Sequence, residues 1–248
     1  SPTAWITYAR CHDDIGWAVS DEDAAAVGLD GSAHRRFLSD FYSGEFPGSW
    51  ARGVVFQENE ANGDRRISGS LASLAGLEVG DPDAVRRILL AHAIMFGFGG
   101  LPVIWMGDEL GLLNDPEWDS IPEHAEDNRW AHRPRMPWPI PADTHRIQRG
   151  VRALVRARAT LPHLHASVPA EVLDPRDPSV FLVARRHPLG PMLGAYNMKA
   201  EPRHVPLEVL HSVGLDPARV VDHLTGSAPD IRDDAVQLAP YAAAWLVQ

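Results

Sequence analysis

The stretch that most constrains the fold is DPDAVRRILLAHAIMFGFGGLPVIWMGDELG, residues 81 to 111. Apolar side chains recur in it at helical spacing, Asp81 and Pro82 suit the first positions of a helix, and Gly99 with Gly100 suit its end. The run LPVIWMG then predicts a short, apolar, fully buried strand, and GDELG a turn. A helix, a buried strand and an acidic loop in this order are typical of an α/β barrel, whose active-site loops follow the strands.

A second strand with a polar end is predicted near the start of the chain. Residues 4–11 alternate loosely between apolar and polar, and His12, Asp13 and Asp14 follow directly. GDELG repeats this pattern with its own acidic pair. Such carboxylates could stabilise a positive charge or accept hydroxyl protons from a sugar, or they could only cap the next helix. The residues alone leave these alternatives open.

The remaining segments differ in character along the chain. Residues 18–80 are mixed and rich in glycine, which predicts an excursion without any long helix. A polar loop over 114–144 contains three tryptophans, and HRIQRGVRALVRARATL predicts an amphipathic helix with arginines opposite its apolar stripe. After about residue 165, short β-rich runs (SVFLVARR, MLGAYNM, RVVDHL, AAAWLV) predict an antiparallel β domain.

Composition excludes several classes of protein. A net charge of -10 disfavours nucleic-acid binding, and 45% hydrophobic with 23% charged residues argues against disorder and against membrane spanning. The single cysteine, Cys11, excludes an internal disulfide framework, and no segment has zinc-ligand spacing, so we predict no metal and no cofactor. The opening SPTAWITYAR starts almost inside a strand, which suggests the C-terminal part of a longer protein. The compartment therefore stays open, with a faint lean to the cytoplasm from the free cysteine.

Four motifs carry a resemblance to a known family. They are RCHDDIGW, FPGSWARGVVFQEN with GDRRISG, GGLPVIWMGDELGLLND, and EDNRWAHRPR. Together they resemble the α-amylase clan, glycoside hydrolase family thirteen, and within it the sucrose-acting subgroup of amylosucrase and sucrose hydrolase. The resemblance runs from about residue 4 to 135 and continues more weakly to the end.

The resemblance implies a fold and a division into domains. The expected fold is α/β, the C-terminal portion of a (β/α)8 TIM barrel followed by an antiparallel β-sandwich domain. Residues 1–17 would be barrel strand seven with its catalytic loop, and 18–80 the lobe inserted after it. Residues 81–163 would supply a helix, barrel strand eight, an active-site loop and the last barrel helix, and 164–248 the C-terminal β domain.

The resemblance also implies site residues. His12 and Asp13 match the pair that binds the glucosyl ring, and Asp13 would stabilise the transition state. The substrate-binding positions around the fructosyl or acceptor subsite would be Asp14, Arg66, Gln57, Phe37 and Arg35. Arg129 would form the salt bridge that closes a pocket for one glucosyl unit. The sequence alone favours a core position for Phe37 and a surface ion pair for Arg129, and Arg66 beside Arg65 could be part of a solvated basic pair.

The expected reaction is retaining cleavage of sucrose with glucosyl transfer to an α-glucan or to water. A retaining mechanism needs a nucleophile and a general acid about 5 Å apart, which the clan supplies from strands that precede the HDD strand. We therefore predict that this chain alone is inactive, and that its partner is the N-terminal part of the same barrel. Alternatives are a non-catalytic carbohydrate-binding fragment and an interaction protein that completes a split barrel. Within the clan, the activities of sucrose hydrolase, trehalose synthase and sucrose phosphorylase remain as further alternatives.

Overall fold

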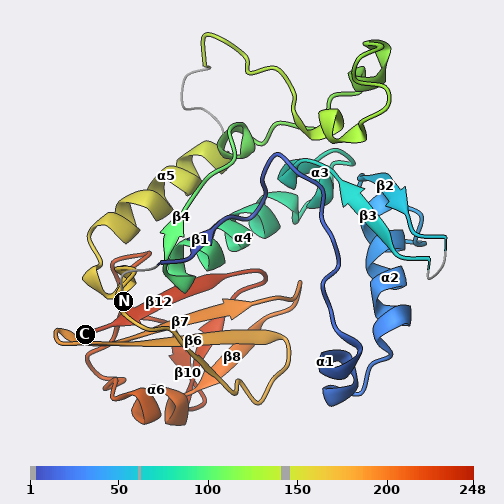
Figure 1. The fold of residues 1–248 in the computed structure, drawn as a ribbon. Coiled ribbons are helices and arrows are strands. Elements are labelled where there is room, and N and C mark those ends of the chain that lie inside the picture. The colour runs from blue at the N-terminus through green and yellow to red at the C-terminus, as the bar shows by residue number, and fades with distance from the viewer. Residues whose placement is uncertain (1–3, 61–62, 141–145) are drawn as a thin grey trace. The chain divides into compact units, whose positions relative to one another are not determined.

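A computed structural model describes residues 4–60, 63–140 and 146–248 (Figure 1). The chain divides into two compact units. The first unit is made of Ser1–Ala9, Arg86–Val103 and His145–Gln248, and the second of Arg10–Val85 and Ile104–Thr144. Within the described ranges, no helix combines the length and the apolar character needed to cross a membrane.

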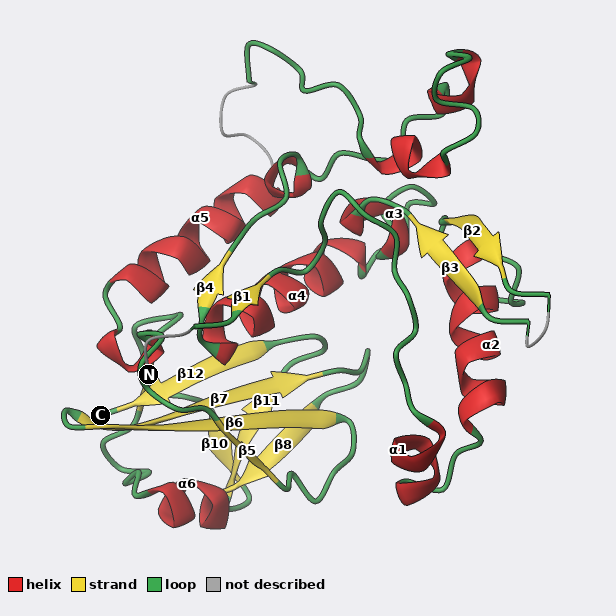
Figure 2. Cartoon of the chain, viewed as in Figure 1, coloured by secondary structure: helices red, strands yellow, loops and turns green. Residues whose placement is uncertain are grey.

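The C-terminal part of the first unit consists of antiparallel strands in two sheets (Figure 2). The larger sheet has the order β5-β6-β7-β12-β9 and the smaller one β10-β11-β8. The elements are β5 (Glu171–Leu173), β6 (Val180–His187), β7 (Gly190–Asn197), β8 (Arg203–Pro206), α6 (Leu207–Val213), β9 (Val221–Asp222), β10 (Ile231–Arg232), β11 (Ala235–Leu238) and β12 (Ala243–Val247). The predicted runs SVFLVARR and MLGAYNM therefore overlap most of β6 and β7, and RVVDHL and AAAWLV contain β9 and β12.

One apolar core joins the two sheets and α6. Leu182 of β6, Leu193 of β7 and Leu246 of β12 meet Val236 of β11 and Leu210 of α6, all of them buried. Inward-facing apolar side chains from two antiparallel sheets are the core of a β-sandwich. The expected antiparallel β domain is confirmed in this form.

Two helices and a parallel strand pair complete the first unit. Helix α4 (Ala84–Phe98) ends where Gly99 and Gly100 adopt positive φ, and α5 (Arg146–Ala159) and the short η4 (Pro162–Leu164) follow later in the chain. Strand β1 (Ile6–Thr7) pairs in parallel with β4 (Leu101–Pro102). The Thr7 hydroxyl donates to the main-chain oxygen of Gly99 at 3.3 Å, which ties β1 to the end of α4.

The buried Arg185 and the partly buried Arg158 hold the carbonyl end of α4. Arg185 donates to Phe98 O at 2.7 Å and to His163 O at 2.6 Å, and Arg158 donates to Gly100 O at 2.9 Å. The last carbonyls of a helix lack partners within the helix and carry partial negative charge. Guanidinium groups therefore donate hydrogen bonds to main-chain carbonyls at this end of the helix, in place of water.

The parallel strand pair differs from what we predicted. We expected a strand over residues 4–11 and a fully buried strand over LPVIWMG, but β1 and β4 are two residues each, and Leu101 is 54% and Val103 47% exposed. Parallel strands are buried where further strands flank them and helices cover both faces. In the described part of the chain, β1 and β4 pair only with each other. The barrel itself therefore stays a prediction.

The second unit is built from short elements. They are α1 (Asp21–Ala26), α2 (Gly31–Ser43), β2 (Val54–Glu58), β3 (Arg65–Ser68), α3 (Leu71–Leu74), and the 3-10 turns η1 (Asp108–Leu110), η2 (Trp118–Ser120) and η3 (Asn128–His132). Strands β2 and β3 form an antiparallel hairpin. The expectation that residues 18–80 contain no long helix is wrong, because α2 has 13 residues. Asp30 caps its N-terminus and Gly44 ends it in the left-handed conformation, and between its first residue and Gly44 no glycine or proline interrupts it.

Candidate functional site

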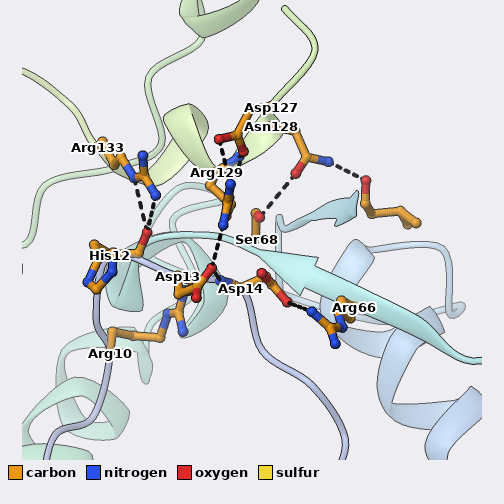
Figure 3. A network of polar contacts seen from close by, with 11 residues as sticks. Arg10, His12, Asp13, Asp14, Arg66, Ser68, Asp127, Asn128, Arg129 and Arg133 are labelled. Carbon is orange, nitrogen blue, oxygen red and sulfur yellow. Dashed lines mark hydrogen bonds and ion pairs between the residues drawn. The ribbon is translucent and has the colours of Figure 1, made fainter. Parts of the chain in front are cut away.

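Arginines of the second unit surround His12, Asp13 and Asp14, which we call the HDD segment (Figure 3). Arg133 donates to His12 O through Nε at 3.0 Å and Nη2 at 2.6 Å, and Arg10 donates to Asp13 O through Nη2 at 2.7 Å. The main chain is thus held from two directions, and the side chains of the HDD segment remain available for other contacts.

The Asp13 carboxylate is ionised, oriented and accessible. Its Oδ1 accepts from Arg129 Nη1 at 3.0 Å and from the Asp14 N–H at 3.0 Å. These contacts, the one from Arg129 above all, hold the pKa of Asp13 well below its ordinary range. The side chain is nevertheless 48% exposed. The structure therefore presents a fixed negative charge to solvent at this point.

Asp14 has the opposite environment. Its side chain is only 5% exposed, and its Oδ2 lies 3.3 Å from Arg66 Nη1. Burial, and then the neighbouring Asp13, raise the pKa of Asp14, while Arg66 opposes this rise. Neither Asp13 nor Asp14 caps the next helix, α1, because the N-cap of that helix is Ser20.

Arg129 is positioned by the DNRW motif that carries it. The Asp127 carboxylate caps η3 and accepts from Arg129 Nε at 2.7 Å and Nη2 at 2.9 Å, so the guanidinium bridges Asp127 and Asp13. The Phe56 ring of β2 lies 5.2 Å from the guanidinium carbon. Arg129 thus belongs to the site as an acid-binding group, and its predicted closure of a one-glucose pocket stays a prediction.

A cavity of about 690 Å³ lies beside the hairpin β2–β3 and is lined by Gln57, Arg66 and Trp17 among others. Gln57 has φ +54° where the β2–β3 register shifts, which is an uncommon conformation for a residue other than glycine. Arg66 reaches Asp14 from the cavity wall. The predicted residues Gln57, Arg66 and Asp14 therefore come together in one place.

Arg35 and Phe37 lie on α2. Arg35 donates to Asp21 at 2.8 Å and to Asp64 at 3.2 Å, and Asp64 also lines the cavity. The Phe37 ring is 40% exposed and contacts other aromatic rings, among them Phe46 at 5.0 Å between centroids. Arg35 therefore reaches the cavity only through a carboxylate partner, and the ring contacts of Phe37 are to none of the other predicted site residues in the described chain.

Titratable residues outside the predicted set of site residues lie buried in the same unit. Arg10 is 5%, Asp108 4% and His132 1% exposed. Burial raises the pKa of Asp108 to about 7, against the charge of Arg10, and burial together with Arg10 lowers the pKa of His132 to about 4. The sequence signal for these residues was their position inside the motifs RCHDD, GDELG and NRWAHRPR.

Metal ligation has no support in this region. Within the described residues, no three side chains of histidine, cysteine, aspartate or glutamate are grouped closely enough to hold a metal ion.

Comparison with known proteins identifies the C-terminal domain. Residues 170–247 match the family model Amylosucrase_C-like, described as the amylosucrase C-terminal domain. The chain is similar in structure to AmyP in complex with maltose, with TM-score 0.54 and 17% identity over 71% of this chain and 37% of that one. It is also similar to an Anoxybacillus α-amylase, with TM-score 0.51 and 20% identity over 72% of this chain and 35% of that one.

At these identities the two structures show a shared fold. The chain spans little more than a third of the length of either protein. The predicted resemblance to the α-amylase clan is confirmed for the C-terminal part: residues 170–247 match the amylosucrase C-terminal domain, and the chain shares its fold with an Anoxybacillus α-amylase.

Proposed function

We propose that this chain supplies the Asp13 side of the active site of an amylosucrase-like retaining enzyme. The enzyme would split sucrose, release fructose and transfer the glucosyl unit to an α-glucan or to water. The observation that carries the proposal is the half-exposed Asp13 carboxylate, which Arg129 and the Asp14 N–H hold in one orientation. The amylosucrase C-terminal-like domain over residues 170–247 supports the choice of family.

The geometry suits the chemistry of glycoside cleavage. The transition state resembles an oxocarbenium ion, and hydrogen bonds to ring hydroxyls that strengthen there lower the barrier. Asp13 stays ionised at all ordinary pH values because its pKa is lowered, so it can accept such a hydrogen bond and stabilise positive charge. His12 is exposed beside it and can donate or accept at the same sugar ring.

The cavity beside β2–β3 is the proposed place of the fructosyl group or of the acceptor. Its volume of about 690 Å³ is within the range of small-molecule sites. Gln57 and Arg66 offer a neutral amide and a cation, and Asp14 lies against Arg66. Sugar hydroxyls bind to groups of these kinds through hydrogen bonds.

The partner of this chain in the complete site is proposed to be further β/α units of a barrel. Trp5 is 83%, Ile6 62% and Tyr8 54% exposed around β1, and Leu101 is 54% exposed on β4. Further strands and helices would bury these side chains, since parallel sheets are normally covered on both faces. Those units would also supply the nucleophile and the general acid, so we expect no turnover of sucrose by the 248 residues alone.

The test is a sucrose assay on the complete gene product. We expect fructose release, and we expect Asp13→Asn to lower kcat by about 10²–10³ fold because the amide cannot stabilise positive charge. Asp115→Asn is the matched control, since Asp115 is also a partly exposed aspartate of the second unit that accepts from a main-chain N–H, that of Glu117. Absence of fructose release by the complete product, or full activity of the Asp13 variant, would contradict the proposal.

A second candidate function is sugar binding without turnover by this chain. The cavity favours it, because Gln57, Arg66 and Trp17 belong to one unit and do not depend on further chain. Calorimetric titration of the 248-residue chain with sucrose and with maltotriose tests it, with Arg66→Met as the variant. Heat of binding that Arg66→Met removes, in a chain that releases no fructose, would favour this reading.

A further inference from the structure

We propose that Arg10 is a positioning residue that holds the Asp13 carboxylate in place, with Asp108 as its buried counter-charge; the proposal rests on the function proposed above for Asp13. Arg10 joins two segments that are distant in sequence, donating from Nη2 to Asp13 O at 2.7 Å and from Nε to Gly69 O at 2.9 Å. Gly69 directly follows β3, and so Arg10 ties the HDD segment to the end of the hairpin.

The two hydrogen bonds use the fork geometry of arginine. A guanidinium donates from several nitrogens in one plane, whereas lysine offers a single charged centre. Arg10 is buried, and an unsatisfied buried carbonyl is unfavourable. Arg10 therefore holds both oxygens from two nitrogens of one rigid group, a geometry that a lysine ammonium does not reproduce.

Asp13 depends on this contact for its orientation. Its carboxylate accepts from Arg129 and from the N–H of Asp14, the residue whose peptide bond contains the carbonyl that Arg10 binds. A rotation of that peptide moves the Asp14 N–H and the carbonyl together, because the peptide unit is planar. Arg10 thus controls the direction of one of the two donors to Asp13.

Burial disfavours the ionised form of Arg10, and neighbouring groups favour it. Burial lowers the pKa of Arg10, while Cys11, Asp108, Asp14 and Asp13 raise it, and Asp108 contributes the most of the three carboxyl groups. Asp108 is itself buried, and a main-chain N–H of Leu71 in α3 also favours its ionised form. Arg10 and Asp108 are each no more than 5% exposed, and the charge of each favours the ionised form of the other.

Further titratable groups face this pair from the surrounding elements. Glu109 of η1 raises the pKa of Asp108, and Arg10 lowers the pKa of His132 of η3. Arg133, which follows η3, and Asp13 also act on His132. The pKa of Asp108 of about 7 places its loss of charge near neutral pH, so protonation of Asp108 removes the counter-charge of Arg10 there.

Carboxyl NMR of the 248-residue chain tests the positioning role without any activity assay. The variants are Arg10→Met and Arg10→Lys, and the matched control is Arg158→Met, since Arg158 also donates to main-chain carbonyls but in the first unit. We expect the pKa of Asp13 to rise toward its ordinary value in Arg10→Met, to rise part of the way in Arg10→Lys, and to stay unchanged in Arg158→Met.

An unchanged Asp13 titration in a folded Arg10→Met overturns the proposal. If Arg10→Met does not fold, Arg10→Lys decides by the same criterion, because lysine keeps the charge and loses only the fork. The Arg10 Nε–H signal tests the counter-charge: it should shift with an inflection near pH 7 and lose that inflection in Asp108→Asn. An inflection that survives in Asp108→Asn overturns the assignment of Asp108.

Kinetics of the complete gene product separate this proposal from the function on which it rests. Arg10→Lys should lower kcat by about 100-fold with little change in KM, as expected for a displaced catalytic group. A wild-type product without glycosyl activity contradicts the proposed function, and the NMR titration still decides the role of Arg10. An active product whose kcat is unaffected by Arg10→Lys overturns the positioning role alone.

Discussion

In the core between the two C-terminal sheets, buried side chains are apolar and come from several strands and from α6, as Leu193, Leu246 and Leu210 do. Around the HDD segment the side chains that matter are charged, and arginines alternate with carboxylates. The apolar core gains stability from removal of surface from water, which has no preferred direction. The HDD region depends on hydrogen bonds with defined donors and acceptors. The first region therefore stabilises a fold, and the second orients particular atoms.

The arginines of the two units make the same contrast. Arg185 and Arg158 of the first unit donate to main-chain carbonyls at the end of α4, and their pKa values are lowered by burial. Arg129 and Arg66 of the second unit face carboxylates, and the pKa of Arg129 is raised by Asp127 and Asp13. Arg185 and Arg158 therefore satisfy main-chain carbonyls, whereas Arg129 and Arg66 bind carboxylates.

The largest effect is expected from Trp245→Ala in the apolar core. Trp245 is fully buried and donates from Nε1 to the Tyr196 hydroxyl at 3.2 Å. Loss of a buried Trp side chain costs about 3–5 kcal/mol of unfolding free energy. Native-state hydrogen exchange should show this loss in strands of the first unit and much less in the β2–β3 hairpin.

The control for the core variant is Trp138→Ala. Trp138 is 71% exposed, and its removal should change stability by less than about 0.5 kcal/mol. An equal loss of protection in both units after Trp245→Ala would break the comparison between them.

The next effect concerns the pH dependence of stability in the second unit. The raised pKa of Asp108, about 7, gives a stabilising contribution that is present below pH 4 and is lost as pH rises through 7. The lowered pKa of His132, about 4, gives a contribution that is present above pH 6.5 and is lost as pH falls through 4. The two oppose each other, so the wild type should change little between about pH 4 and about pH 6.5.

Single variants should uncover each contribution. Asp108→Asn leaves only the contribution of His132. The free energy of unfolding should then rise with pH by on the order of 3 kcal/mol. His132→Phe leaves only the contribution of Asp108, and stability should then fall with rising pH by on the order of 3 kcal/mol over this range. Urea denaturation across this pH range measures both. Slopes of the same sign in the two variants would show that the pKa directions are wrong.

A smaller effect is expected for Arg129→Lys. Lysine cannot bridge Asp127 and Asp13 as the fork does, so the pKa values of both acids should rise toward their ordinary values. The guanidinium is one-third exposed and screened by water, so the loss of stability should be small. Carboxyl NMR checks the direction. Arg232→Lys, in an exposed pair with Asp230 at the same sequence spacing, should leave Asp13 unchanged.

The smallest effect is expected at the start of α2. The Asp30 carboxylate accepts from the Ala33 N–H at 2.7 Å, and its removal in Asp30→Ala should cost about 1 kcal/mol in chemical denaturation. Asp30→Asn keeps an oxygen acceptor and should cost much less. A larger loss in Asp30→Asn than in Asp30→Ala would show that charge, and not capping, is what α2 needs.

Local patterns predicted much of the fold. The α4 helix ends at Phe98 before the predicted glycine pair, although it starts at Ala84 and not at Pro82, because residues 81–83 form a turn. The β-rich runs after residue 165 became strands, since their apolar residues face a shared core. The predicted buried strand LPVIWMG failed, because burial depends on neighbours that no local pattern contains.

The candidate site was predicted in part. Asp14, Arg66 and Gln57 come together at one cavity and Arg129 reaches Asp13, while the ring contacts of Phe37 are with aromatic neighbours such as Phe46. Arg10 and Asp108 were not predicted as a pair. They are 98 residues apart in the chain, and neither motif indicates that the other lies near it.

The sequence by itself determined the β-rich runs after residue 165, the glycine end of α4 and the identity of the HDD segment, because these depend on neighbouring residues and on side-chain chemistry. Only the tertiary structure decided that Asp13 stays ionised while burial raises the pKa of Asp14. The two residues are chemically identical and adjacent, so no local rule separates them. Their difference comes from burial and from Arg129 and Arg66, which folding brings from distant parts of the chain.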